Sequence, residues 1–300
     1  MKFSAWPGLA APWNEVLEIS RHLERTGWDG LYFADHFMPN QEDVSGPTQE
    51  GWTSVAALAA LIPRVTIGTL VTGNTYRHPA VLAKMAAQVD IISGGRLVLG
   101  LGAAWQQNEH EKYGIEFGTV GWRMKRLEES VQIIRSLFAN DRTDFAGKHY
   151  TITDAPLAPK PVQRPGPPIL IGGGGEQVTL RIAATYADQW NVWGSPDTLA
   201  RKGAVLEQHC EKVGRDPKTI HRSAQALLIL TDDASVVERA RERSRQPLLA
   251  GGVDEVVDTL GRYRDAGVDE FIVPNAGLGA FERQRETYDR FMQDVVTKLK

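Results

Sequence analysis

The stretch Asp29-Gly-Leu-Tyr-Phe-Ala-Asp-His-Phe37 places two titratable side chains directly after a short apolar segment. Residues 31–34 predict a buried strand, and Asp35 and His36 follow at its carboxyl end. Burying a carboxylate beside an imidazole is energetically costly. In a barrel of parallel strands, the carboxyl ends of the strands form the catalytic face. We therefore interpret Asp35 and His36 as candidate catalytic residues, rather than as a helix cap and a packed core histidine.

Outward from this stretch, apolar strands alternate with amphipathic helices along the chain. The pattern predicts eight strands, at 2–6, 31–34, 65–71, 97–101, 168–171, 189–192, 221–230 and 270–273. Such alternation is typical of parallel strands joined by crossover helices. Eight repeats in 300 residues favour an α/β fold of the closed (β/α)₈ TIM barrel type. An open doubly wound sheet is the alternative, because periodicity does not prove closure.

Helical spacing fills most of the intervals between these strands. Helices are predicted at 12–26, 52–62, 79–92, 121–138, 177–186, 196–213, 235–245, 253–266 and 281–299. Insertions at 38–51 and 103–120 follow the second and fourth strands, where they would lie over the catalytic face. A β-hairpin around Gly147-Lys148 precedes the fifth strand. No boundary divides the chain, so we expect a single domain over 1–300.

Composition narrows the class of protein. The chain is 42% hydrophobic and 24% charged, which is typical of a globular domain. A net charge of -3 without a basic tract argues against nucleic acid as a partner. The single cysteine, Cys210, excludes disulfides within the chain, and no apolar run is long enough to predict a membrane span. With no signal-peptide pattern at the start, we expect a cytoplasmic protein, and no Cys/His spacing predicts a metal site.

Four glycines, Gly172 to Gly175, follow the predicted fifth strand and precede a helix. Glycine lets backbone amides approach an oxyanion closely, and a helix N-terminus adds a favourable field. This pattern indicates a phosphate site, for which a cofactor is the expected ligand. It is neither a Walker loop nor a dinucleotide fingerprint. The alternative is a tight turn without a ligand.

Polar side chains also follow the third and fourth strands. Asn108, after the fourth strand, suits a ring carbonyl, a ring nitrogen or a ribityl hydroxyl, although it could equally cap the next helix. Thr72 ends the third strand, and His78 is interpreted as part of a helix start. Four tryptophans at predicted strand ends would line a flat aromatic pocket for a planar ligand: Trp6, Trp105, Trp190 and Trp193.

Two other enzyme classes are not supported. No Gly-x-Ser-x-Gly elbow indicates a serine hydrolase. A phosphate-binding isomerase or aldolase would need a lysine or paired carboxylates at strand ends, and no such lysine is found.

The chain resembles the bacterial luciferase-like flavin and deazaflavin oxidoreductases, a superfamily of (β/α)₈ barrels. The resemblance covers nearly the whole chain. Its most specific parts are Ala34-Asp-His-Phe37, His78-Pro-Ala-Val-Leu-Ala-Lys84, residues 90–102 and residues 168–175. The opening Met1-Lys-Phe-Ser-Ala-Trp-Pro7 is similar to the subgroup that uses coenzyme F420, a deazaflavin.

This resemblance implies roles for individual residues. Asp35 and His36 match an acidic-histidine pair beside the cofactor ring, with His36 as proton donor or acceptor. Thr72 and Asn108 match cofactor contacts, and the Gly172–Gly175 loop, through Gly173 and Gly174, matches the backbone that meets the cofactor phosphate. A non-prolyl cis peptide is expected behind the ring between Thr69 and Leu70, which makes these two residues part of the cofactor site.

Two chemistries share such a scaffold. We favour hydride transfer between F420 and a small organic substrate; the alternative is an FMNH2-dependent monooxygenase that uses O2 and needs a separate flavin reductase. A third interpretation is a non-catalytic flavin-binding protein. Trp105 stands where some sugar-phosphate dehydrogenases of the superfamily carry a glutamate, which argues against a sugar phosphate as substrate. The resemblance also implies a homodimer that forms through the helices at 52–62 and 79–92.

Overall fold

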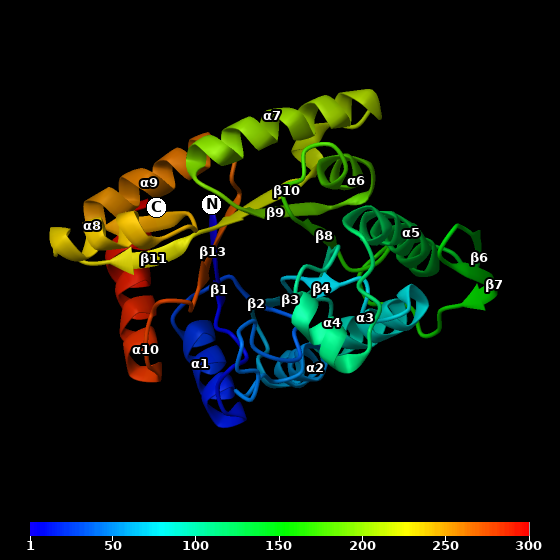
Figure 1. The fold of residues 1–300 in the computed structure, drawn as a ribbon, viewed down its shortest axis with the longest axis horizontal. Helices are drawn as coiled ribbons and strands as arrows, with labels where there is room; N and C mark the ends of the chain where they lie inside the picture. Colours follow the sequence, from blue (N-terminus) through cyan, green and yellow to red (C-terminus); the bar gives the residue numbers. More distant parts are fainter. Residues whose placement is uncertain (300) are drawn as a thin grey trace.

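The computed structural model describes residues 1–299 and forms a closed barrel of parallel strands wrapped by helices (Figure 1). The strands follow one another around the barrel, and the pairing of the third with the fourth barrel strand closes it. This confirms the (β/α)₈ prediction. The barrel strands are β1 (Lys2–Trp6), β2 (Gly30–Phe33), β3 (Thr66–Thr69) with β4 (Thr72–Gly73), β5 (Leu97–Gly102), β8 (Ile169–Gly172), β9 (Gln189–Trp193), β10 (His221–Gln225) and β13 (Glu270–Pro274).

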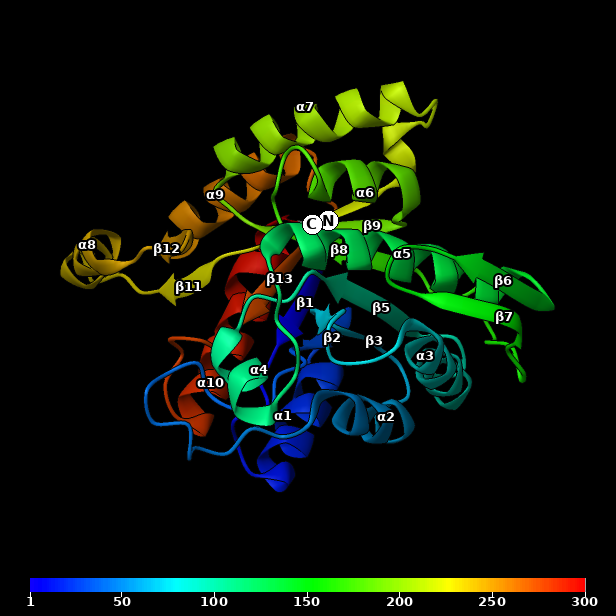
Figure 2. The same ribbon diagram turned by 45° about the vertical axis from the view of Figure 1, so that its right-hand side comes forward.

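Helices cover the outer side of the barrel, as the turned view in Figure 2 also shows. Most begin near the predicted residues, because the features that start a helix are local in sequence. In the helix that starts at Pro79, for example, this proline occupies the first turn, and His78 before it accepts a hydrogen bond from the amide of Ala80 at 3.2 Å. The helices are α1 (Trp13–Arg25), α2 (Gly51–Leu61), α3 (Pro79–Ser93), α5 (Val120–Ala139), α6 (Thr179–Tyr186), α7 (Pro196–Lys212), α9 (Val253–Asp265), α10 (Phe281–Arg290), the π-helix η2 (Phe291–Val296) and α11 (Thr297–Leu299).

The smaller elements lie between the barrel strands. The predicted hairpin is present as β6 (Arg142–Ala146) and β7 (Thr151–Pro156). A short helix, α4 (Gln107–Tyr113), stands inside the predicted insertion at 103–120. A 3₁₀ turn, η1 (Pro217–Thr219), precedes β10.

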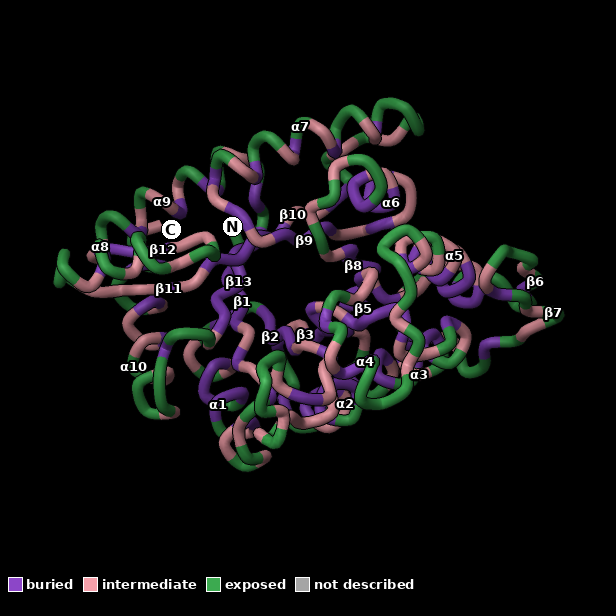
Figure 3. Tube along the Cα trace, viewed as in Figure 1, coloured by how far each residue is buried: buried purple, intermediate pink, exposed green. Residues whose placement is uncertain are grey.

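Buried side chains form two layers. Figure 3 shows much of the barrel strands in purple, the colour of buried residues. The larger layer lies between the strands and the helices. A smaller one fills the barrel itself and consists of Tyr32, Leu70, Val98, Leu170 and Ile272. This inner cluster forms a solid floor, so the space above it at the carboxyl ends of the strands can hold a ligand.

The predicted seventh strand at 221–230 is divided in the structure. β10 stays in the barrel, whereas β11 (Leu227–Leu230) leaves it and pairs with β12 (Leu248–Gly251); α8 (Ala234–Arg243) connects the two. β12 is a short strand of four residues that was not predicted. The resulting insertion stands at the same end of the barrel as the candidate catalytic residues.

The third barrel strand is interrupted, and a non-prolyl cis peptide joins Leu70 to Val71. Our expectation of Thr69–Leu70 is therefore wrong by one residue. Thr69 still belongs to the regular strand, because its hydroxyl donates to the carbonyl of Gly100 at 3.0 Å and accepts from its amide at 3.1 Å. The chain can depart from the strand only after this anchor.

Candidate active site

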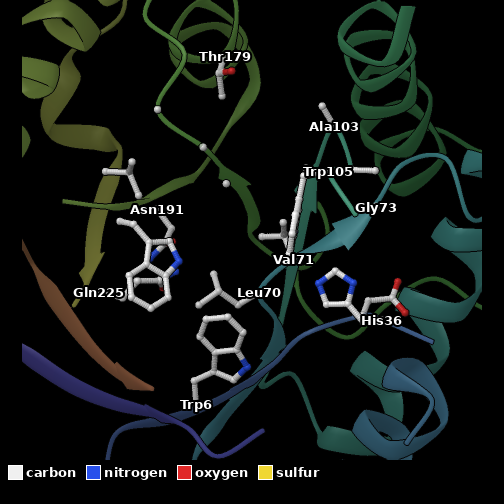
Figure 4. A pocket seen from close by; sticks show the side chains of 18 of the residues that line it. Trp6, His36, Leu70, Val71, Gly73, Ala103, Trp105, Thr179, Asn191 and Gln225 are labelled. Atoms are coloured by element: carbon white, nitrogen blue, oxygen red, sulfur yellow. The ribbon is translucent and has the colours of Figure 1, made fainter. Parts of the chain in front are cut away.

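A cavity of about 630 Å³ opens at the carboxyl ends of the strands (Figure 4). Its walls come from seven of the eight barrel positions and from the loops that follow them. Several of the predicted site residues meet here: Trp6, Asp35, His36, Leu70, Gly172, Gly173, Gly174, Trp105 and Trp193. Residues more than 150 positions apart in the chain thus form one site.

His36 stands at the cavity wall and is held by a buried carboxylate. Its Nδ1 lies 2.8 Å from Oε1 of Glu109, whose side chain has no exposed surface, while the histidine itself is 22% exposed. The ring of Trp105 packs edge-on against His36 at 5.4 Å between ring centroids. One nitrogen of His36 is therefore occupied, and the other is free to act in the cavity.

Glu109 is ionised because three donors surround it. Burial by itself would raise the pKa of its carboxyl, but hydrogen bonds from His36, the amide of Phe37 and the hydroxyl of Tyr76 together hold this pKa below the usual range. Burial, together with the hydrogen bond to Glu109, raises the pKa of Tyr76 far above that of a free phenol. An ionised Glu109 can only accept hydrogen bonds, so Nδ1 of His36 carries a hydrogen.

Asp35 also lines the cavity, and it is fully buried. Its carboxylate receives two bonds from Arg77, at 2.6 and 3.2 Å, and Arg77 reaches on to Glu50 at 2.6 Å. Burial raises the pKa of Asp35, and the neighbouring guanidinium opposes this rise. The ion pair keeps Asp35 in one orientation beside His36.

The glycine loop forms a narrow cradle on the opposite wall. Gly173 has a φ of +125°, a conformation that favours glycine, and a Cβ on Gly174 would come within 2.9 Å of Val192. The ammonium group of Lys202, on α7, donates a hydrogen bond to the carbonyl of Gly174 at 2.5 Å, and the Lys202 side chain is mostly buried. The amide of Gly173 donates to the carbonyl of Asn191 at 2.9 Å, and Lys202 also pairs with Glu176 at 3.3 Å. The amide of Gly174 is therefore the one on the cavity wall that suits a phosphate. Gly175, by contrast, does not line the cavity.

Three predicted cofactor contacts do not reach the cavity. The hydroxyl of Thr72 accepts from the indole of Trp52 at 2.9 Å, and that of Thr69 is bonded to β5. Asn108 turns away on α4 and donates to the carbonyl of Pro39 at 2.9 Å, so it fastens the loop at 38–51 rather than lining the pocket. Each of these side chains is occupied by a neighbour that the local sequence does not reveal.

The aromatic wall contains three of the four predicted tryptophans. Trp6 and Trp193 lie 6.1 Å apart with their rings tilted by 58°, and Trp105 is 61% exposed at the cavity mouth. Trp190 was wrongly placed here. Side chains alternate along a strand, so Asn191 and Trp193 face the barrel interior while Trp190 faces outward, toward the helices. There its indole donates a hydrogen bond to the carbonyl of Gly173, in the loop after β8, at 2.8 Å.

Sequence reasoning missed several side chains of the site. Glu109 was not predicted as a site residue, although the first turn of α4 brings its carboxylate to His36. Strand alternation could have found two polar residues that line the cavity, Asn191 and Gln225. Gln246 comes from the insertion between β11 and β12, for which there was no signal.

The described residues contain no group of three or more His, Cys, Asp or Glu side chains that could hold a metal ion. Among residues 1–299, no helix combines the length and the apolar composition that a membrane crossing requires.

Residues 1–266 match the model of a protein family described as luciferase-like monooxygenase. The chain belongs to this family. An F420-dependent glucose-6-phosphate dehydrogenase from Amycolatopsis mediterranei is 35% identical, over 96% of this chain and 95% of its own length. An F420-dependent hydroxymycolic acid dehydrogenase from Mycobacterium tuberculosis is 29% identical over 81% of this chain. The matched part covers 65% of the length of that protein. A pyrimidine monooxygenase from Stutzerimonas stutzeri is 29% identical over 83% of the chain.

Among solved structures, an F420-dependent secondary alcohol dehydrogenase in complex with an F420-acetone adduct superposes over the whole chain with a TM-score of 0.87 at 20% identity. At this identity the likeness supports the fold alone. It agrees with the barrel architecture found in this luciferase-like chain.

Proposed function

We propose that this luciferase-like protein is an oxidoreductase that transfers hydride between coenzyme F420 and a small organic substrate. One observation carries the proposal: His36, oriented by ionised Glu109, stands on the wall of a cavity whose opposite wall is a glycine cradle. Among the relatives, the two F420-dependent dehydrogenases support this choice of cofactor.

The residues present fit such a cofactor. The Gly172–Gly174 loop, through the amide of Gly174, and the ammonium of Lys202 would hold its phosphate, because close backbone approach and one mostly buried cation suit that group. Leu70, Val71 and the tryptophans offer flat apolar surfaces to a planar ring. When bound, the deazaflavin supplies hydride exchange.

His36 moves the proton that accompanies the hydride. With a hydrogen on Nδ1 donated to Glu109, neutral His36 presents the lone pair of Nε2 to the cavity and accepts the proton of a substrate hydroxyl. In the reverse direction, protonated His36 returns that proton to a substrate carbonyl oxygen. Glu109 then faces an imidazolium, whose charge its carboxylate stabilises at 2.8 Å.

A second candidate function is FMNH2-dependent monooxygenation with O2. The match to the luciferase-like monooxygenase model and the similarity to a pyrimidine monooxygenase favour it. The same cradle and aromatic wall would serve FMN. The third interpretation, a non-catalytic flavin-binding protein, leaves the His36–Glu109 pair without a purpose.

Similarity keeps sugar phosphates among the candidate substrates, because a glucose-6-phosphate dehydrogenase is 35% identical to this chain. The argument against them still holds, since Trp105 stands where some sugar-phosphate dehydrogenases of the superfamily carry a glutamate. Glu109 does not replace that glutamate as a substrate contact, because its side chain has no exposed surface and does not line the cavity.

Calorimetric titration of the purified protein with oxidised and reduced F420 and with FMN tests the proposal. Binding of F420 alone at micromolar or tighter Kd supports hydride transfer. Binding of FMN alone would replace it with the monooxygenase function and direct the search to a flavin reductase. If neither compound binds, both functions are wrong.

A further inference from the structure

We propose that Gln225 and Asn191 form a recognition pair for the edge of a planar ligand on which an N–H stands beside a carbonyl, as in an imide or lactam. Nothing in the proton-transfer site uses these two carboxamides. The inference rests on the proposed function in so far as the cofactor ring is one ligand with such an edge.

Gln225 is a buried polar side chain whose oxygen lacks a partner. The residue is 3% exposed, and within residues 1–299 no donor lies within hydrogen-bonding distance of Oε1. The residue nevertheless lines the cavity. An unpaired buried oxygen reduces stability, and native proteins contain few of them. Oε1 itself has almost no exposed surface, so a ligand that brings a donor pairs with it only after the carboxamide rotates and exchanges the positions of its oxygen and nitrogen. Such a ligand would relieve the cost of the unpaired oxygen only when it is bound.

Asn191 is the second carboxamide of the pair, on the neighbouring strand. It is 3% exposed and lines the same cavity. Its Nδ2 donates to the hydroxyl of Ser223 at 2.9 Å, which fixes the plane of the amide. Asn191 can therefore offer a ligand its carbonyl oxygen and its second amide hydrogen from a preset orientation.

The surroundings select a flat and neutral ligand. Trp6 and Trp193 form the adjoining wall, and Figure 4 shows Gln225 and Asn191 across the cavity from His36, with Leu70 and Val71 between them. Asp35 and His36 also line the cavity, and Figure 4 shows His36 on the far side from the two carboxamides. A carboxamide offers a donor and an acceptor in one plane, which is the complement of an N–H beside a C=O.

Two ligands carry this edge. One is the cofactor, since deazaflavins and flavins both end in an imide. The other is a substrate of the pyrimidine type. The two sources predict different losses when Gln225 is replaced, so one set of titrations distinguishes them.

The test compares the wild type with Gln225→Leu by calorimetric titration with F420, with FMN, and with uracil added to the cofactor-loaded protein. Gln189→Leu is the matched control, because Gln189 also has a buried oxygen without a partner among the described residues but does not line the cavity. A derivative of the cofactor methylated on its imide nitrogen is titrated in parallel; it removes the donor without any change to the protein.

We expect Gln225→Leu to raise the Kd of one of the ligands by about tenfold or more, and Gln189→Leu to leave every Kd unchanged. If the cofactor is the ligand, the wild type should bind the methylated derivative about as much more weakly as Gln225→Leu binds the unmodified cofactor. Gln225→Leu should then bind the methylated derivative no more weakly than the wild type does. If a substrate is the ligand, cofactor binding stays constant and uracil binding falls.

Thermal unfolding provides an independent readout. Removal of an unpaired buried oxygen leaves the ligand-free Gln225→Leu protein at least as stable as the wild type, whereas a structural role would lower its Tm. The inference is overturned if the wild type binds F420 or FMN, Gln225→Leu binds every ligand as tightly as the wild type does, and the methylated cofactor binds as tightly as the unmodified one. That result leaves the proposed function intact. A wild type that binds none of the three compounds overturns both.

Discussion

At the scale of single residues, one carboxylate decides what His36 can do. Glu109 is buried, accepts from His36, Phe37 and Tyr76, and so fixes the hydrogen of the imidazole on the nitrogen that faces away from the cavity. The proton-transfer unit that we propose is therefore a histidine with an orienting carboxylate and not the Asp35–His36 dipeptide alone. Asp35 is held separately by Arg77.

Replacing His36 with alanine should lower the rate while preserving the fold and cofactor binding. A positioned acid or base contributes about 100-fold or more to a rate, so we expect a kcat reduced by about that factor. The measurement is steady-state turnover of the cofactor together with its calorimetric Kd. His149→Ala, at the hairpin, is the control and should retain full activity. An undiminished kcat for His36→Ala would contradict the proton-transfer role.

Glu109→Gln should show a pH-dependent loss of stability. The folded-state pKa of Glu109 is lowered below the unfolded value of about 4.3, so its contribution is fully present above that pH and is lost as pH falls through the folded pKa. We expect a cost of about 1–3 kcal/mol at pH 7 that shrinks at pH 4 and below.

Urea unfolding of the wild type and Glu109→Gln at both pH values measures this difference. Glu111→Gln is the control, since Glu111 lies on the exposed side of the same helix. A cost that is equal at pH 7 and pH 4 would show that Glu109 is not held ionised by its neighbours.

At the scale of elements, the interruption between β3 and β4 shapes the floor of the cavity. It depends on close approach to β5, where a Cβ on Gly100 would lie 1.9 Å from the carbonyl oxygen of Thr69. A strand pattern over 65–71 predicts the element but not its interruption, because the anchor of Thr69 comes from another strand.

Gly100→Ala should therefore displace the segment around Leu70 and Val71. We expect a stability loss of about 1–3 kcal/mol, as for other overpacked sites, together with weaker cofactor binding. Urea unfolding and calorimetric titration measure the two effects. Gly261→Ala, on α9 with open space around its Cβ position, should instead stabilise the protein by about 0.5–1 kcal/mol. Unchanged cofactor binding by Gly100→Ala would separate this segment from the site.

At the scale of the whole molecule, α2 and α3 expose large apolar side chains on their outer faces. Leu61, Val81 and Ile92 are all at least 40% exposed there, between polar residues such as Lys84 and Gln88. A group of exposed apolar side chains is typical of a protein–protein contact. The homodimer through α2 and α3 stays a prediction, which these side chains favour.

Light scattering at micromolar protein should give a mass of about 66 kDa, twice the 33.1 kDa of one chain. A double substitution of Leu61 and Val81 by glutamate should shift the mass to that of the monomer, because it places charges in an apolar contact. Val213→Glu, at the end of α7, replaces an equally exposed valine elsewhere and should leave the dimer intact. A wild-type mass near 33 kDa would refute the prediction.

Local pattern determined much of this protein. The alternation of strands and helices, the hairpin, the cap at His78, and the positions of Asp35, His36 and the glycine loop at strand ends all follow from residues close together in the chain. Backbone hydrogen bonding and the periodic burial of side chains act over a few residues, so these features could be predicted from the sequence.

Only the tertiary structure decided which side chains meet. Glu109 contacts His36 across 73 positions of the sequence. Asn108 and Thr72 form hydrogen bonds with residues outside the cavity, and the side chain of Trp190 points toward the helices. Strand register and helix packing set these contacts, and both depend on atoms that are far apart in sequence. The reactive strand end is thus a local property of the chain, whereas the orientation of its histidine is a property of the closed barrel.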